Sequence, residues 1–289
     1  MNDIVVVAFS VLTSVAILIL VSLGLAVIFG LMRIVNMAHG EFVMIGAFTV
    51  TTLVRSGGLS VWLAILIAPI VSAAIGLIVE ALLIRPLYGR RLVDTLLVTF
   101  GVSLILFQIA VNVFGTTSPG IETPMGAIKV GDYSVAVYSS VFLPIAAIAV
   151  MIALYLVFKR TRYGLLARAT AQNQEMASAL GVYSRRVNVI TFALGCALAG
   201  LSGGLLAPIV AVSPSLGQNY VAQAFMTVVT GGPAFLLGTA TASALLGTVA
   251  NIVSQVMTTL WGLTALFLTA MVLIRFLPNG LSGSFRRQF

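Results

Sequence analysis

Residues 160–186 read RTRYGLLARATAQNQEMASALGVYSRR, a polar stretch in a chain that otherwise consists mainly of apolar runs. It contains five arginines and directly follows Lys159, so residues 159–186 are called the basic segment. Between Leu165 and Leu180 it is rich in Ala, Leu, Gln and Glu and has no proline, which favours a helix, and Gly181 provides a stop. A short helix between two spanning runs, on the basic side of the membrane, predicts a docking element for a soluble partner.

The composition is that of a membrane protein. Only 8% of the 289 residues are charged and 60% are hydrophobic, and the mean hydropathy is +1.16. Soluble domains carry about 25% charged residues, so a water-soluble fold is excluded for most of this chain. The net charge of +8 is too sparse and too segregated for nucleic-acid binding and is typical of charge that sets membrane topology. The single Cys196 lies in an apolar run, which excludes a disulfide framework and indicates a packing role.

Apolar runs of about 20 residues, the length that crosses a bilayer, fall near residues 5–30, 60–84, 94–114, 138–158, 187–211, 235–256 and 258–276. Two shorter runs, 41–55 and 220–232, each follow a polar or Gly/Pro-broken loop. The first run exceeds the 7–15 residues of a signal-peptide core and lacks a cationic start, so we expect it to remain as a spanning helix. The sequence therefore predicts an all-α polytopic membrane protein with about 8–10 transmembrane helices, two of them short and broken.

The positive-inside rule orients the chain, because cytoplasmic loops carry an excess of Lys and Arg. If both short runs cross the membrane, the N-terminus is outside and thirteen of the fifteen Lys and Arg residues are inside. Besides the basic segment, the inside residues are Arg33, Arg85, Arg90, Arg91, Arg275, Arg286 and Arg287. Arg55 and Lys129 remain outside, and residues 115–137 form an external loop.

The order of the runs indicates an internal repeat. A long run, a polar loop, a short run and two long runs make up residues 1–114, and the same order recurs in residues 187–276. The first half starts outside and the second starts inside, as in an inverted repeat. Short interrupted helices at matching positions of such repeats point to a translocation site at the repeat interface.

Asn36, His39 and Glu41 form a first polar cluster within the loop NMAHGE. Ionisable groups at membrane depth are costly, which makes these residues candidates for the translocation path. In the alternative interpretation the loop lies at the cytoplasmic interface near Arg33, Glu41 caps the following helix and His39 bonds a carbonyl group. A metal site is not expected, because His39 has no second His or Cys to complete one.

A second polar cluster follows the loop before the other short run, near the predicted outer face, and comprises Gln218, Asn219, Tyr220 and Gln223. Neutral amides can bind polar, uncharged or zwitterionic solutes without the cost of burying a net charge, so this cluster is also a candidate for the path. Alternatively, its amides bond exposed backbone at a broken helix end. Other amides stand singly in the runs and are expected to bond between helices: Gln108, Asn112, Asn251 and Gln255.

Two further patterns predict contacts within the fold, and the motifs of common enzyme classes decide whether catalysis is expected. Glu80 lies about one turn before Arg85, which predicts an ion pair at the cytoplasmic interface. Gly195, Ala199 and Gly203 repeat every four residues and predict a seam of close helix contact. Neither of the two lysines lies in a phosphate-binding GxxxxGK[ST] loop, and HExxH does not occur. The stretch GLSGG (200–204) has the spacing of GxSxG, but it lies in the small-residue seam. An enzyme and a cofactor are therefore not expected, and ATP-driven work would require a partner ATPase.

Two motifs resemble the permease family of branched-chain amino acid ABC importers, in its LivH-like form. FGLMRIVNMAHGEFVMIGAF (29–48) resembles that family's N-terminal signature. TRYGLLARATAQNQEMASALGV (161–182) resembles its cytoplasmic coupling segment, and the helix VNVITFALGCALAGLSGGLLA (187–207) follows. The resemblance covers nearly the whole chain and implies a single permease domain over residues 1–289 in the bacterial inner membrane.

The resemblance also implies partners, which are a second LivM-like permease, two ABC ATPase subunits, a periplasmic solute-binding protein and membrane lipid, but no nucleic acid. The helix Leu165–Leu180 would lie in a cleft of an ATPase subunit. The residues expected to contact the ATPase are Arg168, Gln172, Asn173 and Glu175, with Ala177, Leu180 and Gly181 shaping the helix.

The solute is either a branched-chain or hydrophobic amino acid, or urea or a short-chain amide. SPSLGQNYVAQAFMTVVTGG (213–232) is closer to the urea and amide branch of the family. The chain then departs from the common Gly-Gly-x-Gly pattern with Pro233 and Ala234, which is expected to change the bend of that helix.

A protein of a different class, a stand-alone channel or secondary transporter, would carry solute without ATP. A secondary transporter normally has a membrane-embedded acid for ion coupling. The candidates in this chain are Glu41 and Glu80, and both lie close to arginines.

Overall fold

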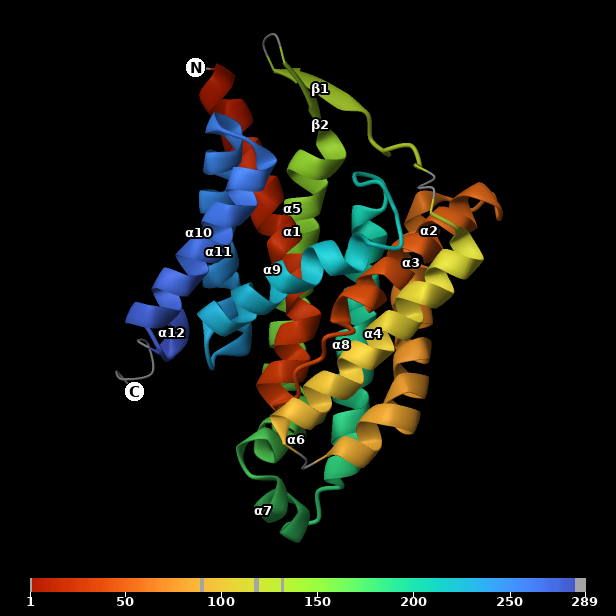
Figure 1. The fold of residues 1–289 in the computed structure, drawn as a ribbon, viewed down its shortest axis with the longest axis vertical. Helices are drawn as coiled ribbons and strands as arrows, with labels where there is room; N and C mark the ends of the chain where they lie inside the picture. Colours follow the sequence, from red (N-terminus) through yellow and green to blue (C-terminus); the bar gives the residue numbers. More distant parts are fainter. Residues whose placement is uncertain (1, 89–90, 117–119, 131–132, 284–289) are drawn as a thin grey trace. The chain divides into compact units, whose positions relative to one another are not determined.

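The computed structural model describes residues 2–88, 91–116, 120–130 and 133–283 (Figure 1). Arg90, Arg286 and Arg287, which entered the topology prediction, lie outside these described residues. By contacts the chain forms two compact units. Unit 1 comprises Met1–Ser22, Glu122–Met151 and Ala222–Phe289, and unit 2 comprises Leu23–Ile121 and Ile152–Val221.

Among the described residues, seven helices are long and apolar enough to cross a membrane, as the seven long runs predict. They are α1 (Asn2–Met32), α3 (Val61–Val79), α4 (Leu92–Phe114), α5 (Leu143–Arg160), α8 (Ser184–Leu206), α10 (Phe235–Val256) and α11 (Thr259–Phe276). A π-helical turn η1 (Glu80–Ile84) and a 3₁₀ turn η2 (Arg85–Leu87) extend α3, and a π-helical turn η3 (Tyr138–Phe142) precedes α5. The run 187–211 is helical only to Leu206, shortly before Pro208, which lacks the N–H that a helix requires.

The two short runs form the short helices α2 (His39–Arg55) and α9 (Leu216–Gly231). The basic segment contributes α6 (Arg162–Gln172) and α7 (Gln174–Ala179), and α12 (Gly280–Gly283) ends the described chain. The predicted external loop also contains two short strands that the sequence did not predict, β1 (Ala127–Val130) and β2 (Tyr133–Ala136). They pair antiparallel, with Lys129 opposite Ser134.

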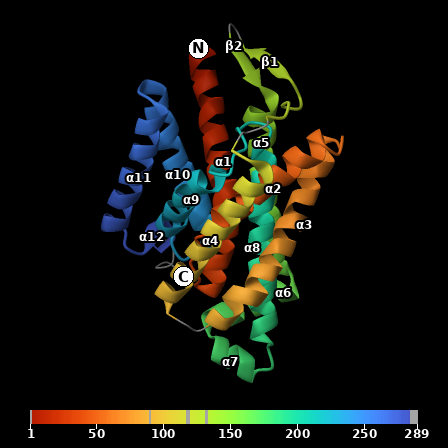
Figure 2. The same cartoon turned by 45° about the vertical axis from the view of Figure 1, so that its right-hand side comes forward.

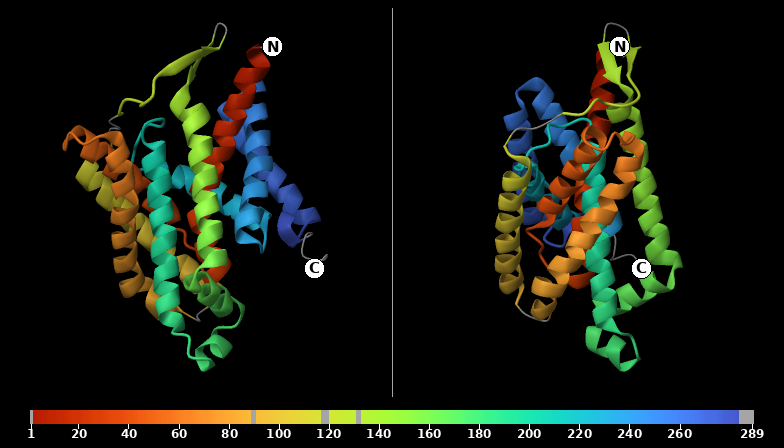
Figure 3. Two further views of the ribbon diagram at one scale, coloured as in Figure 1. Left: turned by 180° about the vertical axis from the view of Figure 1, so that it is seen from behind. Right: turned by 90° about the vertical axis from the view of Figure 1, so that its right-hand side faces the viewer.

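In unit 2, α8 packs against both α3 and α2, and most of α2 is buried (Figure 3). The predicted small-residue seam makes this packing possible. A side chain at Gly203 would collide with the backbone of Val43 on α2, and one at Gly195 would collide with Ile28 on α1. The seam is therefore confirmed as the line along which backbones approach closely.

The two ends of unit 2 differ in charge. The end of α1, the turn between α3 and α4, and the pair α6–α7 lie at one end, and the turn between α2 and α3 lies at the other (Figures 1 and 3). Arg33, Arg85, Arg91 and the basic segment thus share one end, whereas Arg55 is the last residue of α2 at the opposite end. This is the separation of charge on which the topology prediction rests.

In unit 1, α10 and α11 lie side by side (Figure 2). Their core includes Leu246, Leu266 and Ala270, which cluster with Leu18 of α1. Asn251 on α10 donates to the Ser14 hydroxyl at 2.8 Å and accepts from the Ser10 hydroxyl at 2.9 Å. The Gln255 amide donates to Ser10 Oγ at 2.9 Å, so these two amides join helices as predicted. Gln108 instead bonds Asn112 within α4, and the expectation for that pair is wrong because four-residue spacing favours an intrahelical bond.

Candidate functional site

The basic segment folds as two helices, so the single helix predicted for Leu165–Leu180 is wrong. Asn173 has φ −154° and ψ 105°, which breaks the helical path between α6 and α7. Its side chain accepts a hydrogen bond of 2.9 Å from the backbone N–H of Met176 and so caps α7. The reason for the break is local, because an Asn side chain can replace the backbone partner of a helical N–H and then favours a helix start over a helix interior.

The predicted stop at Gly181 is confirmed. Gly181 has φ +86°, a conformation that glycine adopts without steric cost. Val182 N–H donates to the Ala177 carbonyl and Gly181 N–H to the Ser178 carbonyl, both at 3.0 Å. This pair of bonds is the Schellman motif, which satisfies carbonyl groups at the end of α7 and turns the chain toward α8.

Most of the predicted contact residues on the basic segment lie on the surface. Exposed residues are Arg168, Gln172, Asn173, Glu175, Leu180 and Gly181, whereas Ala177 is buried. Leu180 is 79% exposed and Met176 is 60% exposed, although both are apolar. Sequence reasoning missed Met176, but its position four residues before Leu180 places the two on one helical face. The segment therefore presents an apolar pair among charged and amide groups.

Two hydrogen bonds between side chains attach α6 and α7 to α8. The hydroxyls of Tyr163 and Thr191 lie 2.8 Å apart, and those of Ser178 and Ser184 lie 2.8 Å apart. Burial raises the pKa of Tyr163 above its ordinary value, an effect that the bond to Thr191 partly opposes. Both helices of the basic segment are thus bonded to α8.

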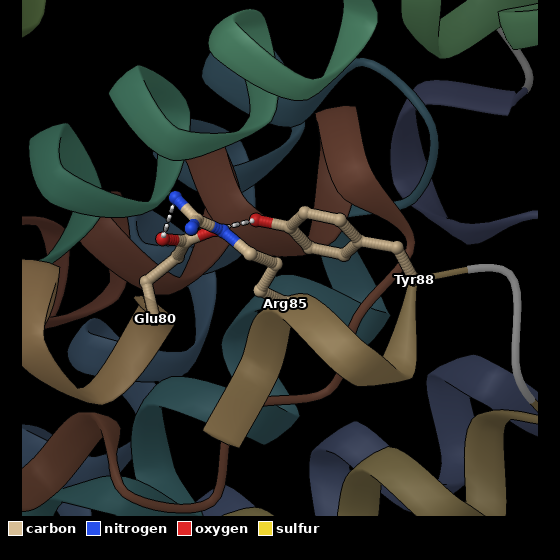
Figure 4. Close-up of polar contacts among 3 residues, drawn as sticks. All are labelled: Glu80, Arg85 and Tyr88. Atoms are coloured by element: carbon tan, nitrogen blue, oxygen red, sulfur yellow. Dashed lines mark hydrogen bonds and ion pairs between the residues drawn. The ribbon is translucent and has the colours of Figure 1, made fainter. Parts of the chain in front are cut away.

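A charged cluster lies where α3 ends (Figure 4). Glu80 is 1% exposed, and its Oε2 lies 3.5 Å from the guanidinium of Arg85, whose side chain is 37% exposed. The predicted ion pair is confirmed. The Tyr88 hydroxyl, which the sequence did not indicate, donates to Glu80 Oε1 at 2.7 Å. Burial raises the pKa of Tyr88, as do the hydrogen bond to Glu80 and its negative charge, while Arg85 and Arg185 lower it.

The first polar cluster is buried at the level of the middle of a spanning helix. Glu41 Oε1 accepts a 2.9 Å hydrogen bond from Ser103, which stands halfway along the 23 residues of α4. Asn36, His39 and Glu41 are all buried, and no side-chain bond caps the start of α2. The interfacial interpretation of this loop is therefore wrong. The packing of α2 against α3 and α8, and not the nearby Arg33, sets its depth.

The two polar clusters adjoin each other. A side chain at Gly217 would lie 2.5 Å from the carbonyl carbon of Gly40, so the first turns of α2 and α9 touch through their backbones. The second cluster is thus at the level of the first, and its predicted place near the outer face is wrong. Gln218 and Asn219 are exposed on α9, whereas Tyr220 and Gln223 are partly buried.

Ala234, where the chain departs from the family pattern, has a negative φ. Its φ is −83° and it is the N-cap of α10, and its N–H donates to the Ser282 hydroxyl at 3.0 Å. Ser282 in turn donates to the Gly231 carbonyl at 2.7 Å. An alanine adopts this conformation freely, so no glycine is required at position 234.

Three features together define a multi-pass membrane permease. They are the spanning helices, the two short helices whose first turns meet at mid-span, and the polar helix pair at one end. Comparison with known families identifies its kind. The chain belongs to the family described as branched-chain amino acid transport system / permease component, which its residues 7–276 match. It is accordingly an inner-membrane protein and the permease component of a transport system.

Relatives from several organisms cover most of the chain. The high-affinity branched-chain amino acid transport system permease protein BraD of Pseudomonas aeruginosa is 30% identical over 278 residues, 91% of each chain. The corresponding LivH of Salmonella typhimurium is 25% identical over 279 residues, 91% of this chain and 90% of that protein. A probable LivH of Methanocaldococcus jannaschii is 25% identical over 255 residues, 85% of this chain and 79% of that protein. No solved structure matches the chain significantly.

Proposed function

We propose that this permease couples ATP hydrolysis in two ABC ATPase subunits to solute uptake, through the basic segment. A second, LivM-like permease completes the membrane part, and a periplasmic binding protein delivers the solute. The observation that carries the proposal is the surface of α6–α7, where exposed Met176 and Leu180 lie among Arg168, Glu175 and exposed amides. An apolar pair with a polar rim is the usual form of a contact that a soluble protein covers.

The attachment of the basic segment supports a mechanical role. The bonds from Tyr163 and Ser178 fix α6 and α7 to α8. Helix α8 packs along α2, whose first turn meets α9 at Gly40 and Gly217. A movement that an ATPase imposes on α7 would therefore reach the two polar clusters through rigid helices and close backbone contacts.

The second polar cluster is the better candidate for the lining of the path. Gln218 and Asn219 are exposed at the level of mid-span. Amides that faced hydrocarbon at that depth would be costly, so we infer that this face of α9 borders a water-filled path or the second permease. Asn36, His39 and Glu41 lie beneath it and would support the two helix starts.

A branched-chain or other hydrophobic amino acid is the solute that we favour. The relatives BraD and LivH are named as branched-chain amino acid permeases. The helical N-termini of α2 and α9 meet and carry partial positive charge, which suits the carboxylate of a zwitterion. Urea or a short-chain amide is the alternative, which the resemblance of residues 213–232 supports.

The order of elements supports the inverted repeat. Helices α1, α2, α3 and α4 are long, short, long and long, and α8, α9, α10 and α11 repeat that order. The halves 1–114 and 187–276, with the basic segment between them, are the division that we propose for the single permease domain.

The proposal is tested by charge reversal at Arg168→Glu and Glu175→Lys in the complex reconstituted with its ATPase subunits and binding protein. We expect binding-protein-stimulated ATPase activity and uptake of leucine to fall at least about tenfold, because a charge reversed at a contact repels its partner. Lys129→Glu, an exposed reversal on the hairpin, is the matched control and should leave both activities unchanged. Unchanged uptake in both basic-segment variants would show that the docking role is wrong. Uptake of urea but not leucine would overturn the solute assignment alone.

A further inference from the structure

An apolar groove lies between α2, α3 and α4 in unit 2. Its volume is about 380 Å³, and side chains of all three helices line it, including Ile45, Phe48 and Leu53 of α2, Ile75 of α3, and Ile109 and Val113 of α4. Two contacts between α2 and α4 accompany the groove. The Glu41–Ser103 hydrogen bond lies before it, and the rings of Phe48 and Phe114, which both line it, stack at 4.2 Å.

The groove opens on a surface that is itself apolar. Ile109 and Val113 line the groove and are exposed, and neighbouring exposed residues include Leu66, Ile70 and Ile105. Spanning helices with such a surface face the hydrocarbon of the membrane. A hydrocarbon chain, and not water, is therefore what would enter the groove, since dry apolar cavities admit apolar ligands.

The length of the groove corresponds to one leaflet. The lining of α2 runs from Met44 to Leu53, which are nine helical steps apart, about 14 Å at 1.5 Å per step. The hydrocarbon of a bilayer is about 30 Å thick, so one leaflet supplies about 15 Å. The Glu41–Ser103 bond, at the middle of α4, marks the inner end of this half.

A cation lies at the outer end. Arg55 is the last residue of α2, one turn beyond the lining residue Thr52, and it is exposed. Among the residues that the structure describes, no carboxylate forms an ion pair with it. Arg55 is also one of two cationic residues that the topology leaves on the outer side, against the general rule. A phosphate group at the membrane surface would neutralise it.

We propose that this groove and Arg55 form a binding site for an anionic phospholipid of the outer leaflet. One acyl chain lies between α2, α3 and α4, and the phosphate pairs with Arg55. The acyl chain fills a space that the side chains leave open, and so stabilises α4 against α2. The two other possible occupants, the aliphatic part of a transported solute and a helix of the second permease, give different results in the test below.

The test measures lipids that remain on the purified, delipidated transporter complex after addition of phosphatidylglycerol or phosphatidylcholine, by native mass spectrometry. We expect more phosphatidylglycerol than phosphatidylcholine to be retained. Arg55→Gln should lower phosphatidylglycerol retention about fivefold, the ratio for loss of one interfacial cation. It should lower phosphatidylcholine retention less, because the choline ammonium already offsets the charge of that phosphate. Lys129→Gln, which removes the other outer cation, is the matched control. Equal retention in wild type and Arg55→Gln would overturn the headgroup assignment.

Ala110→Phe fills the groove and should lower retention of both lipids, whereas Ile105→Phe, on the exposed face of the same helix, should not. A second measurement uses the wild type alone, and so does not depend on whether Ala110→Phe folds. Phosphatidylglycerol with a photoreactive acyl chain should label residues 44–53 and 106–114 of the wild type in preference to the exposed faces of α5 and α11. Uniform labelling, competition by leucine, or protection of these residues by the second permease would overturn the proposal.

Discussion

Removal of the Glu80 side chain should destabilise the protein more than removal of its tyrosine partner. In Glu80→Ala, the Tyr88 hydroxyl loses its acceptor at 2.7 Å and Arg85 loses its carboxylate at 3.5 Å. A hydrogen bond to a charged group contributes about 1.5–3 kcal/mol. The ion pair adds less, about 0.5–1 kcal/mol, because Arg85 is 37% exposed and water solvates it in the variant.

These terms set an order for three variants. Glu80→Ala should lower the free energy of unfolding by about 2–4 kcal/mol, and Tyr88→Phe, which loses the hydrogen bond alone, by about 1.5–3 kcal/mol. Glu80→Gln should cost about 1 kcal/mol, because its amide oxygen still accepts from Tyr88 while the ion pair is lost. In a double-mutant cycle, Glu80→Ala and Tyr88→Phe should couple by about 1.5 kcal/mol or more.

The assay is reversible unfolding of the purified permease in mixed micelles, followed by tryptophan fluorescence and circular dichroism. Asp94→Ala is the control, since Asp94 is an exposed carboxylate in the first turn of α4; it should cost less than about 1 kcal/mol. A coupling energy below about 0.5 kcal/mol, or a loss in Glu80→Ala no larger than in Asp94→Ala, would refute the reasoning that these partners hold the end of α3 in place.

Three further predictions follow from other contacts. Gly217→Ala should cost about 2 kcal/mol or more in the same unfolding assay, because its new carbon would lie 2.5 Å from the Gly40 backbone; a neutral result would contradict that close approach. Asn251→Leu should cost about 1–2 kcal/mol, since each hydrogen bond between membrane helices contributes about 0.6 kcal/mol; an unchanged midpoint would show that the bonds add nothing. Because burial raises the pKa of Tyr163, stability should fall as pH rises above about 10, where the unfolded tyrosine ionises first. Thermal unfolding at pH 8 and pH 10.5 should show a smaller loss in Tyr163→Phe, and an identical loss would refute this assignment.

Local properties of the chain predicted most of the helices. Seven runs of sufficient length became seven spanning helices, because the thickness of hydrocarbon sets a length that any sequence must meet. The helix stop at Gly181 and the ion pair of Glu80 with Arg85 could also be predicted from the sequence, since each depends on residues close together in the chain. The break at Asn173 was missed even though it too is local, because Asn is tolerated within helices as well as at helix starts, where its side chain caps as it does with Met176.

The sequence did not predict the hydrogen-bond partners of the buried polar groups. Ser103 is 62 residues from Glu41, and no pattern in either segment indicates their hydrogen bond. The same holds for Tyr88, whose hydroxyl reaches Glu80 only because a π-helical turn and a 3₁₀ turn follow α3. The depth of Glu41 therefore could not be judged from the neighbouring Arg33, and an interfacial place was a reasonable but wrong expectation.

The sequence by itself determined that this chain is a multi-pass membrane protein with a basic segment at one side, because hydropathy, charge and run length act on each segment independently. Only the tertiary structure decided that α2 and α9 meet at Gly40 and Gly217, and that a groove with Arg55 at its end lies between α2, α3 and α4. The physical reason is that spanning helices are apolar on nearly every face. Their composition does not show which face meets which neighbour, and the fit of small and large side chains between helices makes that choice.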